Sequence, residues 1–173
     1  MNNELNKIIK TFKGNVLAIG IDEKLSKKID INENIIKCDI LNYIANKKEK
    51  KIAKQKKVKT IDIKKLRKIY KKKKIDYIIC EYSQIEKYLN TFVKDSVYIN
   101  SSKLYFYGKI NKELLLKKYR RYTDKINITT KKDEYIIEID NTDTKNNKIK
   151  EFGFSVVDKV NSLIEIIGDI LMG

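Results

Sequence analysis

The sequence predicts an α/β domain: a doubly wound, mainly parallel sheet with helices on both faces, an antiparallel hairpin near the edge and a C-terminal amphipathic helix. Short apolar runs alternate with helical patterns over residues 1–140, the order that gives parallel strands joined by crossover helices. Residues 75–80 are apolar on both faces, as in a central parallel strand. Two later runs, at 126–129 and 135–139, are joined by a polar link and predict the hairpin. A chain of 173 residues, 42% of them hydrophobic, can bury one sizeable core.

The first part of the chain is expected to hold a leading helix followed by three short strands. Leu5, Ile8, Ile9 and Phe12 recur at helical spacing before Gly14, which predicts the helix and its end. Apolar runs predict the strands, and the residues between them predict a short helix and an amphipathic helix with lysines on one face. The expected strands are 15–21, 34–40 and 58–61, and the expected helices are 23–30 and 63–74.

The second part is expected to alternate in the same way before the hairpin. Ser83 has Glu86 at the spacing of a capping box, which predicts a helix from there through Val93. Extended segments are expected at 97–99 and 104–107, around the polar residues 100–103, and a helix at 111–124. Residues 1–140 are therefore expected to form the domain, and residues 141–173 a polar link and a helix.

The end of the first expected strand carries the clearest sign of a ligand site. An apolar run from residue 16 ends at Gly20 and is followed by Asp22. A dinucleotide-binding first turn needs glycine where the chain bends sharply and where backbone approaches a ligand, and only Gly20 serves here. Two further acids stand near expected strand ends: Asp39, 19 residues past Gly20, and Asp62, after the third strand.

With these residues and this order of elements, residues 1–140 resemble a class I S-adenosylmethionine-dependent methyltransferase domain, a Rossmann-like family with a mainly parallel seven-stranded sheet that ends in such a hairpin. The resemblance implies S-adenosylmethionine as cofactor, bound by Gly20, Asp22, Asp39 and Asp62. Asp39 would accept hydrogen bonds from the ribose hydroxyls, and Asp62 would lie near the adenine.

The match to the family's first motif is incomplete. The family has an acid two positions before its first glycine, where this chain has Ala18, and its next glycine corresponds to Asp22. Asp22 is also well placed to be an ordinary N-cap of the following helix, and Asp39 to be a strand-end acid exposed to water. The resemblance therefore implies a degenerate donor site.

The catalytic residues are left unknown by the sequence. The chain has no proline, which excludes the proline-containing signatures of base-amino and cytosine-carbon methylation. It has no histidine, so an active enzyme would use Glu81, Asp76, a tyrosine or proximity to the methyl donor. The two cysteines, Cys38 and Cys80, are too few for a metal cluster or a disulfide framework, and Cys80 is expected to be a small buried hydrophobe.

A Lys-rich segment at 44–74 carries most of the positive charge. The chain has a net charge of +16, and this segment alone has +14. Such a segment favours contact with nucleic acid or the ribosome through phosphates, and the alternative is a solvated face that keeps the protein soluble. The basic residues expected to contact nucleic acid are Lys47, Lys48, Lys50, Lys51, Lys54, Lys56, Lys57, Lys64, Lys65, Arg67, Lys68, Lys71, Lys72, Lys73 and Lys74. Tyr105, Tyr107, Tyr119 and Tyr122 could stack on exposed bases, although tyrosines at strand and helix spacing more often pack in the core.

The last segment carries a helical stripe of apolar residues over 149–172. This helix is expected to pack on the domain, on a second copy or on a partner. The chain shows neither a signal peptide nor a transmembrane segment, and its cysteine usage suits a reducing compartment, so we expect a cytoplasmic protein.

Three functions follow as hypotheses. The first is a methyltransferase-like module, degenerate in its donor site, that binds nucleic acid or the ribosome. The second is a divergent but active methyltransferase on RNA or another anionic macromolecule. The third is a non-catalytic interaction domain that uses the C-terminal helix.

Overall fold

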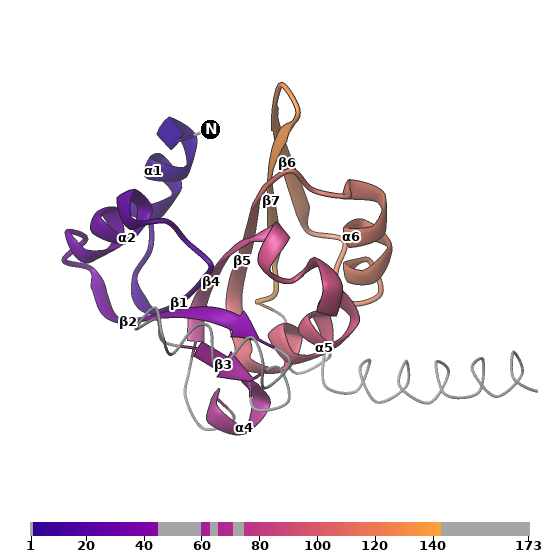
Figure 1. Ribbon diagram of the computed structural model, residues 1–173, viewed down its shortest axis with the longest axis horizontal. Helices are drawn as coiled ribbons and strands as arrows, with labels where there is room; N and C mark the ends of the chain where they lie inside the picture. Colours follow the sequence, from indigo (N-terminus) through magenta and orange to yellow (C-terminus); the bar gives the residue numbers. More distant parts are fainter. Residues whose placement is uncertain (1, 45–59, 63–65, 71–74, 143–173) are drawn as a thin grey trace, which may run out of the picture.

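The computed structural model describes residues 2–44, 60–62, 66–70 and 75–142 (Figure 1). These residues form a seven-stranded sheet in the order β3-β2-β1-β4-β5-β7-β6, in which β7 is antiparallel to both neighbours and the other pairs are parallel. The strands are β1 Gly14–Ile19, β2 Ile35–Ile44, β3 Thr60–Asp62, β4 Ile75–Glu81, β5 Asn100–Gly108, β6 Ile126–Lys131 and β7 Glu134–Asp140. The predicted doubly wound α/β sheet with an edge hairpin is confirmed.

Helices cover both faces of the sheet. They are α1 Asn2–Lys10, α2 Glu23–Asp30, α4 Leu66–Tyr70, α5 Leu89–Ile99 and α6 Lys112–Tyr119, with two 3-10 turns, η2 Tyr82–Gln84 and η3 Glu86–Tyr88. Figure 1 shows α1 and α2 on one side of the strands and α4, α5 and α6 on the other. No helix in the described part of the chain is both long and apolar enough to cross a membrane.

Two apolar clusters, one on each face, form the core. Alternation along β1 assigns its residues: Val16 and Ala18 belong to the cluster under α1 and α2, and Leu17 and Ile19 to the cluster under α4, α5 and α6. Phe12, which is fully buried, joins α1 to the sheet by stacking on Tyr77 with ring centroids 4.5 Å apart. The central strand β4 is buried on both faces at Ile78, Ile79 and Cys80, as its composition predicts.

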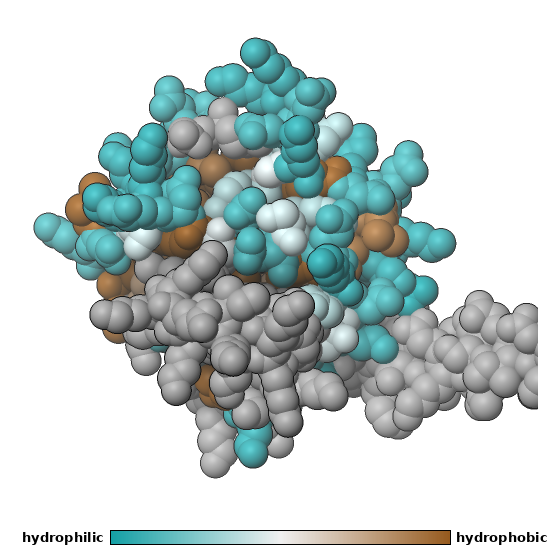
Figure 2. All heavy atoms as spheres, in the orientation of Figure 1, coloured by the Kyte–Doolittle hydropathy of each residue, from teal (hydrophilic) through white to brown (hydrophobic). Residues whose placement is uncertain are grey.

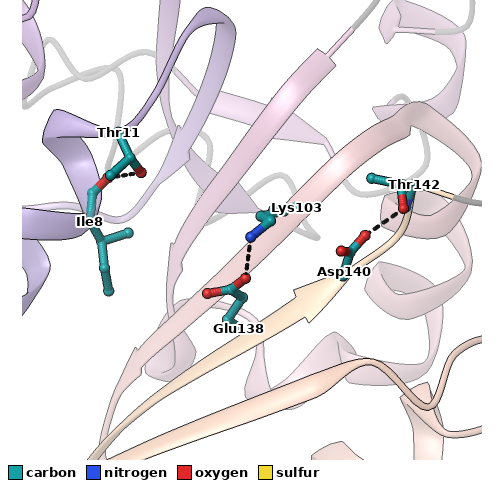
Figure 3. Close-up of polar contacts among 6 residues, drawn as sticks. All are labelled: Ile8, Thr11, Lys103, Glu138, Asp140 and Thr142. Atoms are coloured by element: carbon teal, nitrogen blue, oxygen red, sulfur yellow. Dashed lines mark hydrogen bonds and ion pairs between the residues drawn. The ribbon is translucent and has the colours of Figure 1, made fainter.

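The hairpin edge is held by polar contacts on the face of the sheet. Lys103 on β5 donates a hydrogen bond to Glu138 on β7, and the Asp140 carboxylate accepts one from the backbone N–H of Thr142, which closes the end of β7 (Figure 3). Thr11, just after α1, similarly donates to the carbonyl of Ile8 and ends that helix. β6 and β7 are joined at Lys132, whose φ of 56° lies in the left-handed region of a tight turn.

The segment after β4 differs from its prediction. Ser83 does not cap a helix: its hydroxyl donates to Glu81, the chain makes two 3-10 turns, and α5 begins only at Leu89. Residues 97–99, predicted to be extended, lie in α5, and residues 100–103, between the two predicted extended segments, are part of β5. The reason is that the polar residues Asp95 and Ser96 are buried in this helix with partners, so that its inner face continues to Val97.

Other boundaries shift by smaller amounts. β2 runs to Ile44, four residues beyond its predicted end, because Asn42, Tyr43 and Ile44 pair with β3. The helix predicted over 111–124 ends at Tyr119. The predicted helix at 149–172 and most of the Lys-rich segment lie outside the described residues.

Candidate functional site

The strand order places a topological switch point between β1 and β4. These strands are parallel neighbours, and β1 is followed by α2 on one face whereas β4 is followed by η2 and α5 on the other. Ligands of doubly wound sheets bind in the crevice where the chain diverges in this way, outside the carboxyl ends of the strands. Here that edge holds Gly20 and Asp22 after β1, the segment 81–84 at the end of β4, and Tyr107 at the end of β5.

Gly20 is the point where the chain turns away from β1. Its φ is +66°, a conformation that favours glycine, and a Cβ added here would lie 1.9 Å from Cγ of Gln84. The space against the Gly20 backbone is therefore filled by the Gln84 side chain, which comes from η2. The group that lies close to the Gly20 backbone is therefore a side chain of the same protein.

Asp22 caps the helix that follows. Its Oδ1 accepts a hydrogen bond of 2.7 Å from the backbone N–H of Leu25, and its backbone is extended, with φ −77° and ψ 169°. This is the N-cap geometry expected of an aspartate before a helix. The structure thus gives Asp22 the structural role that its sequence position allowed.

Asp39 lies in the middle of β2, not at its end. It pairs with Leu17, whereas Ile19, the last residue of β1, pairs with Leu41. Its Oδ2 accepts a hydrogen bond of 3.0 Å from the hydroxyl of Tyr70 on α4. Burial and the nearby Asp39 carboxylate raise the pKa of Tyr70, so the phenol stays protonated and remains a donor. Asp39 therefore joins β2 to α4.

Asp62 is the last residue of β3, where it pairs with Ile44. β3 is separated from β1 by β2. Among the four predicted donor-binding residues, Gly20 and Asp22 are therefore brought together, while Asp39 and Asp62 lie on the two strands beyond them.

The end of β4 brings the Glu81 carboxylate and the Tyr107 phenol together, whereas Tyr82, the next residue after β4, is buried in the cluster under α4, α5 and α6. Glu81 pairs with Tyr107 across β4 and β5, and its Oε1 accepts a hydrogen bond of 2.9 Å from Ser83. Burial, followed by the Glu81 carboxylate, raises the pKa of Tyr107. Tyr82 is 1% exposed, and its hydroxyl has no hydrogen-bond partner in the part of the chain that the structure describes. Glu81 can accept hydrogen bonds at this edge, and Tyr107 can donate one.

Asp76, one of the possible catalytic groups, lies at the opposite edge. Its Oδ2 accepts a hydrogen bond of 2.9 Å from the backbone N–H of Asn15 and lies against Gly14, at the start of β1. A carboxylate at the amino ends of the strands does not reach the crevice at their carboxyl ends. Of the two carboxylates predicted as possible catalytic groups, Glu81 lies at the switch point and Asp76 does not.

Of the basic residues predicted to contact nucleic acid, Arg67 and Lys68 are described, both on α4. Arg67 is used within the fold: its Nε lies 3.1 Å from Oδ1 of Asp95, and its guanidinium lies 4.4 Å from the centre of the Tyr98 ring. Lys68 is exposed. The other residues of that prediction fall outside the described ranges.

The cysteines are buried to different degrees. Cys80 is fully buried, as expected of a small hydrophobe, and burial raises its thiol pKa. Burial, with Asp30 and Asp39 nearby, raises the pKa of Cys38 to about 12. No group of three His, Cys, Asp or Glu side chains in the described residues is arranged to hold a metal ion.

The mainly parallel seven-stranded sheet, closed by a hairpin in which β7 lies between β5 and β6, is the arrangement that the resemblance predicted. The described domain has a class I methyltransferase-like fold. Sequence comparison adds nothing to this, since no family model and no curated protein matches the chain.

Solved structures that resemble this methyltransferase-like fold include TrmK of M. capricolum, in complex with its cofactor product S-adenosylhomocysteine. It is 18% identical, with a TM-score of 0.48 over 80% of this chain and 67% of that one. Precorrin-6y C5,15-methyltransferase of Geobacter metallireducens is 12% identical, with a TM-score of 0.48 over 78% and 86% of the two chains. Fibrillarin of Aeropyrum pernix, with natively bound S-adenosylmethionine, is 12% identical, with a TM-score of 0.46 over 79% and 73%.

Sequence reasoning missed one residue of this site. Gln84 was not singled out, because nothing in the periodicity marks a polar residue after β4 as the neighbour of a glycine 64 positions earlier. Tyr82 follows β4 in a segment where the resemblance implies substrate-facing residues, and the structure buries it in the core instead. The single glycine of the β1 turn was the available signal that something must lie close to that backbone.

Proposed function

We propose that this domain is a methyltransferase-like module whose donor corner no longer binds S-adenosylmethionine and which acts by binding nucleic acid, ribosomal RNA included. The observation that carries the proposal is that three of the four predicted donor-binding residues already have partners within the fold. Gln84 lies against Gly20, Asp22 caps α2, and Asp39 accepts the hydrogen bond of Tyr70.

These contacts do not fit a bound donor. A donor approaching the β1 turn would have to displace Gln84 from Gly20. A ribose at Asp39 would share the carboxylate with the Tyr70 hydroxyl, which already occupies Oδ2. A ligand that drew the Asp22 carboxylate away from Leu25 would remove a helix cap worth about 1 kcal/mol. We therefore derive no methyl-transfer step for this corner.

Charge supports the nucleic-acid part of the proposal. The chain has a net charge of +16, and lysine rather than arginine supplies most of it. In the view of Figure 2, hydrophilic side chains cover most of the described surface, with apolar side chains in separate places between them. Lysines make point-charge contacts with phosphates, which hold a polyanion without reading its bases.

A second function, a divergent but active methyltransferase, is favoured by the cluster at the end of β4. Glu81 and Tyr107 pair across β4 and β5 at the edge of the sheet where substrates of this fold class bind. An active enzyme needs a bound donor, so the two functions differ in one measurable property.

The test is calorimetric titration of S-adenosylhomocysteine into the full chain, together with fluorescence anisotropy of a labelled RNA at low and high salt. We expect no heat of donor binding up to millimolar ligand. We also expect RNA to bind with an association constant whose logarithm falls linearly with the logarithm of the salt concentration. Micromolar donor binding that Asp39→Asn abolishes would contradict the proposal and support the active enzyme. Absence of RNA binding at low salt would contradict the nucleic-acid part.

A further inference from the structure

Two cavities adjoin each other between α1 and α2, on the face of the sheet opposite α4, α5 and α6. One has a volume of about 350 Å³ and begins at the carboxyl edge of the sheet, beside Asp22 and Tyr107. The other has a volume of about 490 Å³ and ends at the loop of residues 31–34. Asn6 of α1 and Lys28 of α2 line both cavities, so these two residues lie where the cavities meet. Together they form one continuous surface, which we name the α1–α2 groove.

The α1–α2 groove has an apolar floor. Leu5 and Ile9 of α1 and Leu25 of α2 line it and are at most 7% exposed, since their other sides pack in the core. Tyr107 adds an aromatic ring at the carboxyl edge, where the ring is only half-buried. Both volumes lie in the range of cavities that hold small ligands or parts of larger ones, about 300–1,000 Å³. The floor suits flat apolar groups.

The rim of the α1–α2 groove is basic. Lys10, Lys24, Lys27 and Lys28 line it, against Asp22 and Glu33. Asp22 is already engaged as the cap of α2, and Lys27 pairs with Glu23 at 2.8 Å. Among the described residues, Lys10, Lys24 and Lys28 take part in no ion pair, so their charges are available to a ligand. Figure 2, drawn in the orientation of Figure 1, shows hydrophilic side chains beside apolar ones on the side of the molecule where α1 and α2 lie.

We propose that the α1–α2 groove binds a single-stranded segment of nucleic acid, with a base stacked on Tyr107 and a phosphate at Lys28. The proposal rests on the proposed function and assigns it a surface and a form of nucleic acid. A single strand alternates flat bases with phosphates, and the groove has an aromatic ring in the cavity at the carboxyl edge, a lysine at the junction and a more polar second cavity. A duplex keeps its bases stacked inside and offers the floor nothing to contact.

The chemistry of the two main contacts favours tolerance of sequence. Stacking on an aromatic ring accepts any base, and a lysine contacts a phosphate without reading base edges. Burial and the carboxylates of Glu81 and Asp22 raise the pKa of Tyr107, so the phenol stays neutral beside the strand at ordinary pH. The groove is therefore suited to positioning a strand at the carboxyl edge, close to Glu81.

The test is fluorescence anisotropy of a short labelled single-stranded RNA, and of the same RNA annealed to its complement, with the full chain and four variants. Tyr107→Leu removes the ring, and Tyr107→Phe keeps it. Lys28→Gln removes the charge at the junction, and Lys117→Gln removes one exposed lysine from α6 as the matched control. Thermal unfolding of each variant checks that it folds.

We expect the single strand to bind more tightly than the duplex. Tyr107→Leu should weaken binding about 5- to 150-fold, the effect of losing one stacked base, while Tyr107→Phe binds as the wild type does. Lys28→Gln should reduce by about 1 the slope of the logarithm of the association constant against the logarithm of salt concentration, and Lys117→Gln should leave this slope unchanged. Equal binding of duplex and single strand, wild-type affinity of Tyr107→Leu, or equal effects of the two lysine variants would overturn this assignment while the proposed function stands. Failure of the wild type to bind either RNA would overturn both.

Discussion

The contact between Gly20 and Gln84 decides how the β1 turn can be used. Glycine has no Cβ and adopts positive φ without strain, so a glycine after β1 serves either a close ligand or a close neighbour. In this fold the neighbour is Gln84, and the same turn places Asp22 where its carboxylate caps α2. Both residues that the sequence associates with a cofactor site therefore have structural roles here, since Gly20 allows Gln84 to pack closely and Asp22 caps α2.

Gly20→Ala should destabilise the domain by about 1–3 kcal/mol, since alanine is strained at a φ of +66° and its methyl group would collide with Gln84. Urea unfolding of the full chain measures the loss. The double variant Gly20→Ala, Gln84→Ala separates the two causes, because it removes the contacts at 1.9 and 2.7 Å, leaves the Gln84 Cβ position at 3.0 Å and keeps the strain. We expect the double variant to be more stable than Gly20→Ala alone. Equal stability of the two would show that Gln84 does not press on this turn.

The elements that the sequence predicted well are those whose apolar pattern is not interrupted by polar residues at buried positions. β4 is apolar on both faces, and α1 carries an unbroken helical stripe, so periodicity was sufficient. Prediction failed where polar residues are buried. Asp95 pairs with Arg67, and Ser96 hydrogen-bonds to Val93 and Tyr119, so the helix continues past Val93 through residues 97–99, which were predicted to be extended. The length of β2 depends on β3, a partner that local sequence does not show.

The candidate site follows the same division. The position of Gly20 after β1, and the capping role open to Asp22, were predicted from the sequence and are observed. The place of Asp39 was not, because its distance from the carboxyl edge depends on where β2 ends. The α1–α2 groove depends on how two helices pack, and their amphipathic patterns give only the faces that they bury.

At the scale of a helix, the N-cap of α2 distinguishes a structural aspartate from a ligand-binding one. Asp22→Ala should destabilise the domain by about 1 kcal/mol, because the backbone N–H of Leu25 loses its acceptor. Asp22→Ser keeps a capping oxygen and should stay within a few tenths of a kcal/mol of the wild type. Thermal unfolding of the three proteins measures this. A serine variant as unstable as the alanine variant would contradict the capping role.

Over the whole molecule, several thiols and phenols are partly or fully buried in the fold. Cys38, Cys80, Tyr105 and Tyr107 lie on strands of the sheet, and Tyr70 lies on α4. Burial raises the pKa of Cys38 to about 12 and also raises those of Cys80, Tyr70, Tyr105 and Tyr107. Each of these groups is kept protonated by the fold and ionises more readily in the unfolded chain. The fold is therefore expected to be sensitive to alkaline pH.

Cys38 gives the clearest test of this sensitivity. Its pKa rises from 9.0 to about 12, so its contribution to stability is complete below about pH 9 and is lost as pH rises toward 12. Between these values the unfolded chain gives up the thiol proton and the folded chain keeps it, and one group contributes at most about 1.4 kcal/mol per pH unit. Urea unfolding at pH 8 and at pH 11 should show a smaller loss for Cys38→Ala than for the wild type. Lysines deprotonate in the same range in both proteins, so comparing the two losses isolates the thiol. Equal losses would show that Cys38 ionises as freely in the folded domain as in the unfolded chain.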